Sequence, residues 1–156
     1  MDLTAAARLA HERWMRLALE EARLAGEAGE VPVGAVIVRD GAVIARGRNC
    51  REAGGDALGH AELMAIGAAA RATGDWRLTG CTLYVTLEPC CMCAGGCLNA
   101  RLERVVYGAA DEAAGCLGSR VNLFAMGLGP APGITPGVLA EECRSLLTAF
   151  FASRRP

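Results

Sequence analysis

Apolar and polar residues alternate along this chain with two different periods, and the change of period marks the first elements. Apolar residues recur at helical spacing over residues 12–28, with Arg and Glu between them, which predicts an amphipathic helix. Two short apolar runs follow at residues 33–38 and 42–45, and Asp40-Gly41 separates them. Because Asp-Gly favours a two-residue turn, the runs are predicted to form an antiparallel hairpin.

Helical and strand patterns continue to alternate through the rest of the chain. A polar, glycine-rich segment over residues 48–59 precedes a segment rich in Ala, Leu and Met. The elements expected from there on are a helix over 60–73, a strand over 82–86, a helix starting at Glu88-Pro89, a strand over 104–108 and a helix over 138–154. This alternation predicts an α/β protein built as a three-layer sandwich.

The composition supports one folded domain over residues 1–156. Hydrophobic residues make up 53% of the chain and aromatic residues only 4%, so the core is expected to consist mainly of small aliphatic side chains. No apolar run reaches the roughly 18 residues that a membrane span needs, and the start lacks the pattern of a secretory signal. We therefore expect a cytoplasmic protein without a membrane partner.

The charged residues and the cysteines narrow the chemistry further. All 16 cationic residues are arginine, which excludes a Schiff-base lysine and a phosphate-loop lysine. A net charge of −1 argues against strong non-specific binding of nucleic acid, although an arginine cluster could still contact phosphates. Eight cysteines without a secretory signal indicate reduced thiols, and hence metal binding or redox chemistry.

A histidine and two cysteines stand at the predicted starts of two helices. His60 opens one helix, and Cys90 and Cys93 fall in the first turn of the other. Cys-x-x-Cys at a helix start places both sulfurs on one side, and the helix N-terminus favours thiolates. One imidazole and two thiolates leave a fourth tetrahedral position for water, which is the pattern of catalytic zinc rather than structural zinc.

Glu62 supplies the acid/base group that such a zinc site requires. Zinc bound in this way lowers the pKa of its water to roughly 7. Residues two apart point to different sides of a helix, so Glu62 is poorly placed as a ligand beside His60 but near enough to move a proton. The residues therefore predict hydrolytic chemistry at a zinc ion.

Two motifs carry a resemblance to known enzymes. His60-Ala61-Glu62 and Pro89-Cys90-Cys91-Met92-Cys93 match the H-x-E and P-C-x-x-C signature of zinc-dependent nucleobase deaminases. From about Glu12 to Arg155 the chain also resembles the bacterial tRNA-specific adenosine deaminases, which convert the wobble adenosine of an arginine tRNA anticodon to inosine. Further matching segments are residues 30–35, Asn49, 82–90, 92–95, 137–139 and Glu142-Cys143.

The resemblance implies a fold, a cofactor and a mechanism. The implied fold is the three-layer α/β/α cytidine-deaminase-like fold, with a central mixed sheet of about five strands. One Zn²⁺ per subunit would be held by His60, Cys90 and Cys93. Glu62 would deprotonate the zinc water and then protonate the purine ring and the leaving ammonia.

The resemblance also implies how the substrate is held. Asn49 would hydrogen-bond the target nucleoside, Val31 would line the base pocket, and Asp111 would lie near the ribose of the neighbouring nucleotide. The implied partners are the anticodon stem-loop of a tRNA and a second copy of the chain, because members of this family are homodimers.

Several positions depart from the family's pattern. Residues 56–59 read Asp-Ala-Leu-Gly where the family usually has Asp-Pro-Thr-Ala, and Ala110 stands where many members carry Arg. The stretch 127–133 lacks the usual Asn-His-Arg. The remaining departures are Cys91, Gly96 and Cys97. Fewer positive charges leave open a second interpretation, a deaminase of a free base or nucleoside of the guanine or cytosine type.

Two other interpretations are less favoured. Cys90, Cys93 and Cys97 also form a C-x2-C-x3-C pattern, but an iron–sulfur cluster normally takes four thiolates. A catalytically idle, zinc-stabilised RNA-binding or assembly subunit would have no use for Glu62. His11, the second histidine, is expected to be a solvated residue at a helix start.

Overall fold

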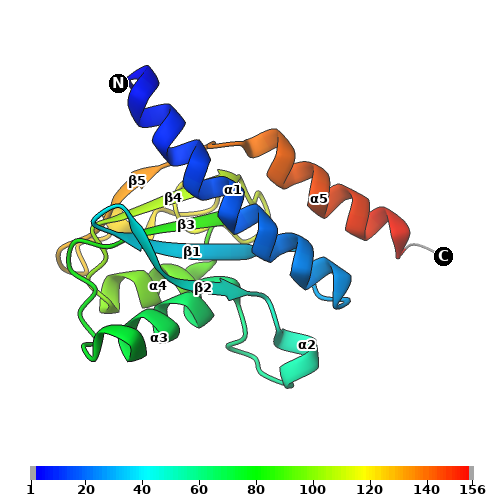
Figure 1. Ribbon diagram of the computed structural model, residues 1–156, viewed down its shortest axis with the longest axis horizontal. Helices are drawn as coiled ribbons and strands as arrows, with labels where there is room; N and C mark the ends of the chain where they lie inside the picture. Colours follow the sequence, from blue (N-terminus) through cyan, green and yellow to red (C-terminus); the bar gives the residue numbers. More distant parts are fainter. Residues whose placement is uncertain (1–2, 155–156) are drawn as a thin grey trace.

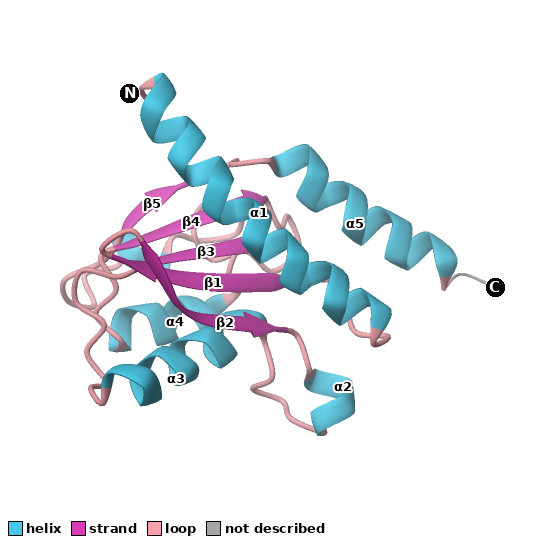
Figure 2. Ribbon diagram, viewed as in Figure 1, coloured by secondary structure: helices cyan, strands magenta, loops and turns pink. Residues whose placement is uncertain are grey.

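In the computed structural model a five-stranded sheet lies between two layers of helices (Figures 1 and 2). The structure describes residues 3–154, so Arg155, the last residue of the family resemblance, lies outside the described part. In chain order the elements are α1 (Ala5–Glu27), β1 (Gly34–Arg39), β2 (Ala42–Arg48), α2 (Arg51–Gly54), α3 (Ala61–Thr73), β3 (Thr82–Leu87), α4 (Cys91–Asn99), β4 (Arg104–Ala109), the 3-10 helix η1 (Leu123–Ala125), β5 (Gly133–Thr135) and α5 (Ala140–Ser153).

The sheet is mixed, with the strand order β2-β1-β3-β4-β5. β1 runs antiparallel to both β2 and β3, whereas β3, β4 and β5 run parallel. At the turn between β1 and β2, Asp40 and Gly41 both have positive φ, 51° and 73°, as a tight hairpin turn requires. The predicted hairpin, the three layers and the five-stranded mixed sheet are thus confirmed.

Successive residues of the strands face the two helical layers in turn, because strand side chains alternate between the faces of a sheet. Ala35 and Ile37 of β1 belong to the core that includes residues of α3 and α4. Val36 and Val38 belong to the core that includes residues of α1 and α5. Figure 1 shows α1 and α5 on one face of the sheet and α3 and α4 on the other.

Two glycines set how closely helices approach the sheet. A Cβ atom at Gly47 of β2 would overlap the backbone of Ala61 at the start of α3. A Cβ atom at Gly34 of β1 would overlap the backbone of Ala18 in α1. Since only glycine lacks this atom, these two positions fix the distance between the sheet and each layer. The first of them holds the start of α3 against β2, next to His60.

α1 and α4 begin three or more residues from their predicted starts, whereas α3 and α5 begin at Ala61 and Ala140, within two residues of theirs. α1 begins at Ala5 rather than residue 12, because the Thr4 hydroxyl accepts a hydrogen bond from the Ala7 amide at 3.1 Å and caps it. α4 begins at Cys91, so the prediction of a start at Glu88-Pro89 was wrong. The Glu88 amide instead donates to the Ala109 carbonyl at 2.8 Å, which keeps this segment alongside β4.

Three short elements and one histidine also differ from the expectations. α2, η1 and β5 were not predicted; β5 has only three residues and exists by pairing with β4. The prediction that His11 is a solvated residue at a helix start was wrong. It lies well inside α1, half-buried, with its Nδ1 atom 2.8 Å from the Tyr84 hydroxyl of β3.

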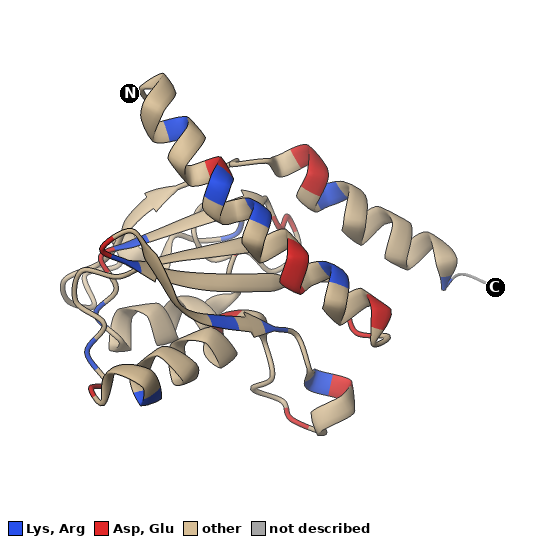
Figure 3. Cartoon of the chain, viewed as in Figure 1, with Lys and Arg blue, Asp and Glu red and all other residues tan. Residues whose placement is uncertain are grey.

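Charged side chains are unevenly distributed over the helices. Figure 3 shows them along α1, on α2 and at the start of α5, whereas α4 carries none and α3 carries only Glu62 and Arg71. The α3–α4 layer is therefore the least charged helical surface of the described chain.

Over residues 3–154, no helix combines the length and the apolar character that crossing a membrane would require.

Candidate metal centre and substrate pocket

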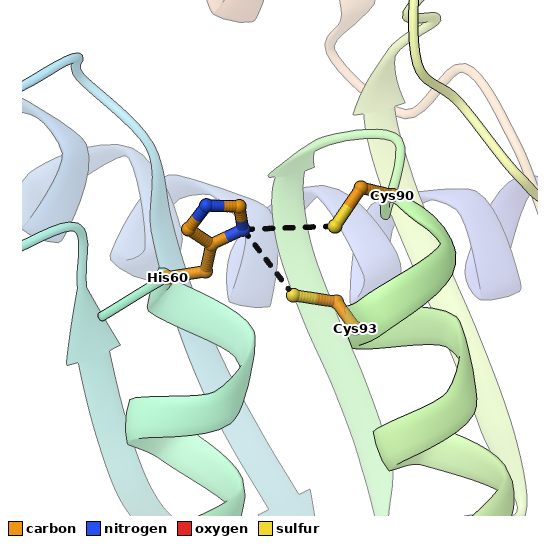
Figure 4. Close-up of side chains that lie close together, drawn as sticks. All are labelled: His60, Cys90 and Cys93. Atoms are coloured by element: carbon orange, nitrogen blue, oxygen red, sulfur yellow. Dashed lines mark hydrogen bonds between the residues drawn. The ribbon is translucent and has the colours of Figure 1, made fainter. Parts of the chain in front are cut away.

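Three side chains from two helix starts meet at one point (Figure 4). The Nδ1 atom of His60 lies 3.6 Å from the sulfur of Cys90 and 3.6 Å from the sulfur of Cys93. All three candidate ligand atoms lie within 4.8 Å of one another. The structure thus brings together the residues that the sequence singled out as metal ligands.

The spacing of these atoms fits zinc. In a tetrahedral site with a Zn–N bond of about 2.1 Å and a Zn–S bond of about 2.3 Å, a nitrogen and a sulfur ligand lie about 3.6 Å apart. Both N–S distances in the structure have this value. Among residues 3–154 no fourth His, Cys, Asp or Glu joins the group, and Cys97 stays outside it. The iron–sulfur interpretation therefore lacks its fourth thiolate.

The two helix starts have the same local geometry, which explains how they converge. His60 is the N-cap residue of α3 and Cys90 is the N-cap residue of α4, and both have extended backbone conformations. An N-cap residue lies just outside its helix with its side chain near the first turn. Cys90 can therefore reach Cys93, the third residue of α4. The helices also lie close together, since a Cβ at Gly96 would press on Leu63.

The two cysteines differ in how readily they ionise. A hydrogen bond from the Cys93 side chain lowers the pKa of Cys90 to about 5, although burial opposes this shift. The Cys93 amide and His60 lower it further. The contact with Cys90, together with burial, raises the pKa of Cys93. Cys90 is thus the more readily ionised sulfur, and the thiolate is the form that binds a metal.

Glu62 lies buried beside this group, with 4% of its surface exposed. Burial raises the pKa of Glu62 to about 7, and the negative charge of Cys90 adds to the rise. Hydrogen bonds from its own amide and from Cys93 partly offset it, as does the charge of His60. A carboxyl group with a pKa near neutrality can both accept and return a proton under physiological conditions.

A cavity of about 190 Å³ opens onto the group. Of the residues singled out from the sequence, all but Cys93 line it, and Cys93 lies fully buried behind it. The complete lining is Val31, Val33, Asn49, Arg51, His60, Ala61, Glu62, Leu87, Glu88, Cys90, Asp111 and Ala114. The cavity is thus built from segments that are far apart in the sequence.

Local hydrogen bonds orient the two polar residues expected to bind substrate. The Asn49 side-chain amide donates to the Val31 carbonyl at 3.2 Å, and its oxygen accepts from the Arg51 amide at 3.2 Å. One oxygen of Asp111 accepts from the amides of Ala113 and Ala114, both at 3.1 Å. Asn49 is therefore held between its own loop and the segment before β1, whereas Asp111 is held by its own loop.

Sequence reasoning missed two buried carboxylates, Glu88 at this cavity and Glu30 at an adjoining concavity. Burial alone would raise the pKa of Glu88, but hydrogen bonds from Ser119, Asp111 and Leu117 outweigh it and lower the pKa. A signal was present in the sequence, because each acid directly adjoins an apolar run that forms a buried strand or pocket wall.

A second concavity, of about 290 Å³, adjoins the cavity and shares Val31, Asn49 and Arg51 with it. Its other side is formed by Phe150 of α5 and by Arg154. The Arg154 guanidinium lies 4.0 Å from the centre of the Phe150 ring. A groove with an aromatic ring and a cation therefore leads from the cavity to the end of α5.

Comparison with known proteins gives a consistent result. The profile of the cytidine and deoxycytidylate deaminase zinc-binding region matches residues 9–109. The tRNA-specific adenosine deaminase of Bacillus subtilis is 48% identical over 145 residues, covering 92% of this chain and 90% of that protein. The profile match includes His60, Glu62, Cys90 and Cys93.

Solved structures give the same family. A structure from a study of A-to-I editing by tRNA:A34 deaminases at the wobble position superimposes with a TM-score of 0.85 and 46% identity, covering 86% of this chain and 99% of that one. Guanine deaminase from Bacillus subtilis matches with a TM-score of 0.62 and 41% identity, over 64% of each chain. The chain therefore belongs to the cytidine and deoxycytidylate deaminase family, among its tRNA-specific adenosine deaminases.

Proposed function

We propose that this chain is a zinc-dependent hydrolase that converts adenosine to inosine at the wobble position of a tRNA anticodon. The observation that carries the proposal is the placement of Glu62, a buried carboxyl with a pKa of about 7, beside three candidate metal ligands at one cavity. A structural metal site has no need of such a residue. The relatives named as tRNA-specific adenosine deaminases support the choice of substrate.

His60, Cys90 and Cys93 would hold one zinc ion per subunit. Bound there, zinc would supply Lewis-acid activation of water close to neutral pH. The positions of the three side chains follow from the starts of α3 and α4, where His60 and Cys90 are the N-cap residues. Cys90 also ionises readily, which favours metal binding.

Glu62 moves the protons of the reaction. It accepts one proton from the attacking water and delivers it to the purine ring, and it then accepts the remaining proton of the added hydroxyl and delivers it to the departing amino group, so that two protons are taken and two are given. Water adds its oxygen to the ring carbon that loses nitrogen, so adenosine and water become inosine and ammonia. The pKa of about 7 suits a group that must take and give a proton in one cycle.

The cavity accepts one base turned out of the RNA. Its volume of about 190 Å³ is below the ~300–1,000 Å³ typical of pockets for larger ligands, which suits a single nucleobase. Asn49 would hydrogen-bond the target nucleoside, Val31 would pack on the base, and Asp111 would lie near the adjoining ribose. The anticodon stem-loop would extend into the groove, where Phe150 offers a stacking surface and Arg154 a cation.

The proposal includes a homodimer, formed through the α3–α4 layer. Helix α4 has no charged side chain, and η1 packs against it. Met126 and Leu128, just after η1, are 59% and 62% exposed. Exposed apolar side chains beside an uncharged helix favour contact with a protein. One deaminase domain per chain and a cytoplasmic site of action, where tRNA is met, complete the proposal.

A second candidate is a free-base deaminase of the guanine type, favoured by the match to guanine deaminase and by the loop over residues 56–59. Asp56 there accepts a hydrogen bond from the Leu58 amide at 2.9 Å, which closes the turn without the family's proline. The exposed Leu58 stands where the family usually has threonine. The loop is therefore ordered but presents a different surface.

The deciding experiment is incubation of the zinc-loaded protein with an arginine tRNA bearing adenosine at the wobble position, followed by sequencing. Conversion to inosine at that position alone, absent in Glu62→Ala, supports the proposal. Release of ammonia from guanine without any change in the tRNA would favour the second candidate.

A further inference from the structure

Two carboxylates besides Glu62 are buried at the cavity and its adjoining groove. Glu30 is 3% exposed and Glu88 is 2% exposed. Within residues 3–154 neither forms an ion pair with an arginine or histidine. Each instead accepts hydrogen bonds from the backbone of a loop. Buried carboxylates need such donors, because an unpaired buried charge is costly.

Glu30 holds the start of α2, although it lies in the connection between α1 and β1. Its two oxygens accept from the amides of Glu52 and Ala53, at 3.0 and 2.7 Å. Cys50, the N-cap residue of α2, makes no capping bond with its own side chain. A helix of four residues is too short to be stable alone. Glu30 therefore supplies the missing cap from a distant part of the chain.

Glu88 holds the loop that follows β4. One oxygen accepts from the Asp111 amide at 3.1 Å and from the Ser119 hydroxyl. The other accepts from the amides of Leu117 and Ser119, both at 3.0 Å. A Cβ at Gly115 would overlap the carboxylate, so the loop backbone closes directly over Glu88.

The two loops held in this way form two walls of the cavity. The α2 loop carries Asn49 and Arg51, and the loop after β4 carries Asp111 and Ala114; all four line the cavity. Asn49 and Asp111 are the polar side chains proposed to hold the substrate, so a shift of either wall would change how the substrate is held. The carboxylates thus act on the pocket through the loops.

We propose that Glu30 and Glu88 are positioning residues for substrate binding, each fixing one wall of the cavity through backbone hydrogen bonds. The inference rests on the proposed tRNA substrate and deepens it. Both oxygens of each carboxylate are engaged with loop donors, which leaves orientation rather than proton transfer as their role. Substrate affinity, and not the chemical step, is therefore the property that they control.

The test replaces each carboxylate by an amide, in Glu30→Gln and Glu88→Gln. Glutamine has one acceptor oxygen and a donor NH₂, so at least one backbone N–H loses its acceptor. We expect KM for the tRNA to rise about tenfold, kcat to stay within about twofold, and zinc content to be unchanged. Hydrogen exchange should quicken at residues 52–53 in the first variant, and at Asp111, Leu117 and Ser119 in the second.

Matched controls separate these effects from a general loss of charge. Glu27→Gln removes an exposed carboxylate at the end of α1, three residues before Glu30. Glu112→Gln does the same beside Asp111, where Glu112 is also exposed. Neither control should change KM or the exchange pattern. Ser119→Ala is a milder test of the second wall, because it removes only the hydroxyl donor to Glu88.

Three outcomes would overturn the inference. One is quickened exchange in the expected loop with unchanged KM, and another is a fall in kcat without a rise in KM. If Glu88→Gln does not fold, Ser119→Ala is judged by the same criteria. The third is an active wild type whose variants behave like the controls. The wild type is assayed on tRNA before any variant. If the wild type is inactive on tRNA, the proposed function itself is refuted, separately from the inference about Glu30 and Glu88.

Discussion

The Nδ1 atom of His60 lies 3.6 Å from the sulfur of Cys93, although 33 residues separate them along the chain. Two helices on the same face of the sheet bring them together, because each helix begins where a strand or loop reaches the same edge of the molecule. The contact is a consequence of packing, and single substitutions can test the role of each residue in it.

Cys93 and Cys97 offer a matched pair for testing the metal site. They lie four residues apart on α4 and both are fully buried, yet only Cys93 belongs to the candidate ligand group. We expect Cys93→Ser to lower the zinc content to well below one ion per chain and Cys97→Ser to leave it unchanged. Elemental analysis of the purified variants measures this directly. Equal loss of zinc in both would contradict the assignment of ligands.

Substitution of Glu62 should separate metal binding from turnover. Because Glu62 lies outside the ligand group, Glu62→Gln should retain zinc. Loss of a positioned acid/base group typically slows a reaction by about 10² to 10⁴-fold, so we expect a decrease in kcat of this order. Zinc content and initial rates on tRNA are measured on the same preparation. Substantial activity of the variant would refute the role given to Glu62.

The dimer can be tested at Gly95, which faces open space on α4. A Cβ added there meets no atom within 4 Å, so Gly95→Glu should leave the isolated chain folded. Placing a charge on the uncharged α3–α4 layer should nevertheless disfavour association through it. We expect a dimer for the wild type and a monomer for the variant in sedimentation experiments. A variant that remains a dimer would place the interface elsewhere.

The groove beside the cavity predicts a specific role for Phe150. If a flanking base stacks on this ring, Phe150→Ala should weaken tRNA binding by about 1–3 kcal/mol. Phe151, which is 48% exposed and next in sequence, is the control, because it does not line the groove. Both substitutions are made in a protein that also carries Glu62→Gln, so that the RNA is not converted at an appreciable rate. The affinity of each protein for an anticodon stem-loop is then measured and compared. Equal effects at both positions would argue against stacking in the groove.

His11 predicts how stability depends on pH. Burial, with a smaller contribution from the charge of Arg104, lowers the pKa of His11 below its usual 6.5. As pH falls below about 6.5, the unfolded chain therefore binds a proton at this histidine more readily than the folded chain does. The free energy of unfolding decreases as a result, so the protein loses stability towards acid pH. In His11→Gln, the free energy of unfolding should fall less between about pH 7.5 and about pH 5.5. Urea titrations at both pH values, with wild type in parallel, measure the difference.

Part of the fold could be predicted because its signals are local. Asp40-Gly41 specifies a tight turn through the backbone preferences of two adjacent residues, and the apolar runs on either side form the strands. β5 could not be predicted in this way. Its three residues lie in a glycine- and proline-rich stretch and become a strand only by pairing with β4, about 30 residues earlier in the chain.

The site divides along the same line. The sequence by itself determined the candidate chemistry, because His60-Ala61-Glu62 and Cys90-x-x-Cys93 place candidate metal ligands and a candidate acid/base group at the starts of two helices. Only the tertiary structure decided how the pocket is held in shape. Glu30 and Glu88 act on backbone amides more than 20 residues away, and a backbone amide is present at nearly every residue. Such partners leave no pattern in a sequence, so folding alone reveals them.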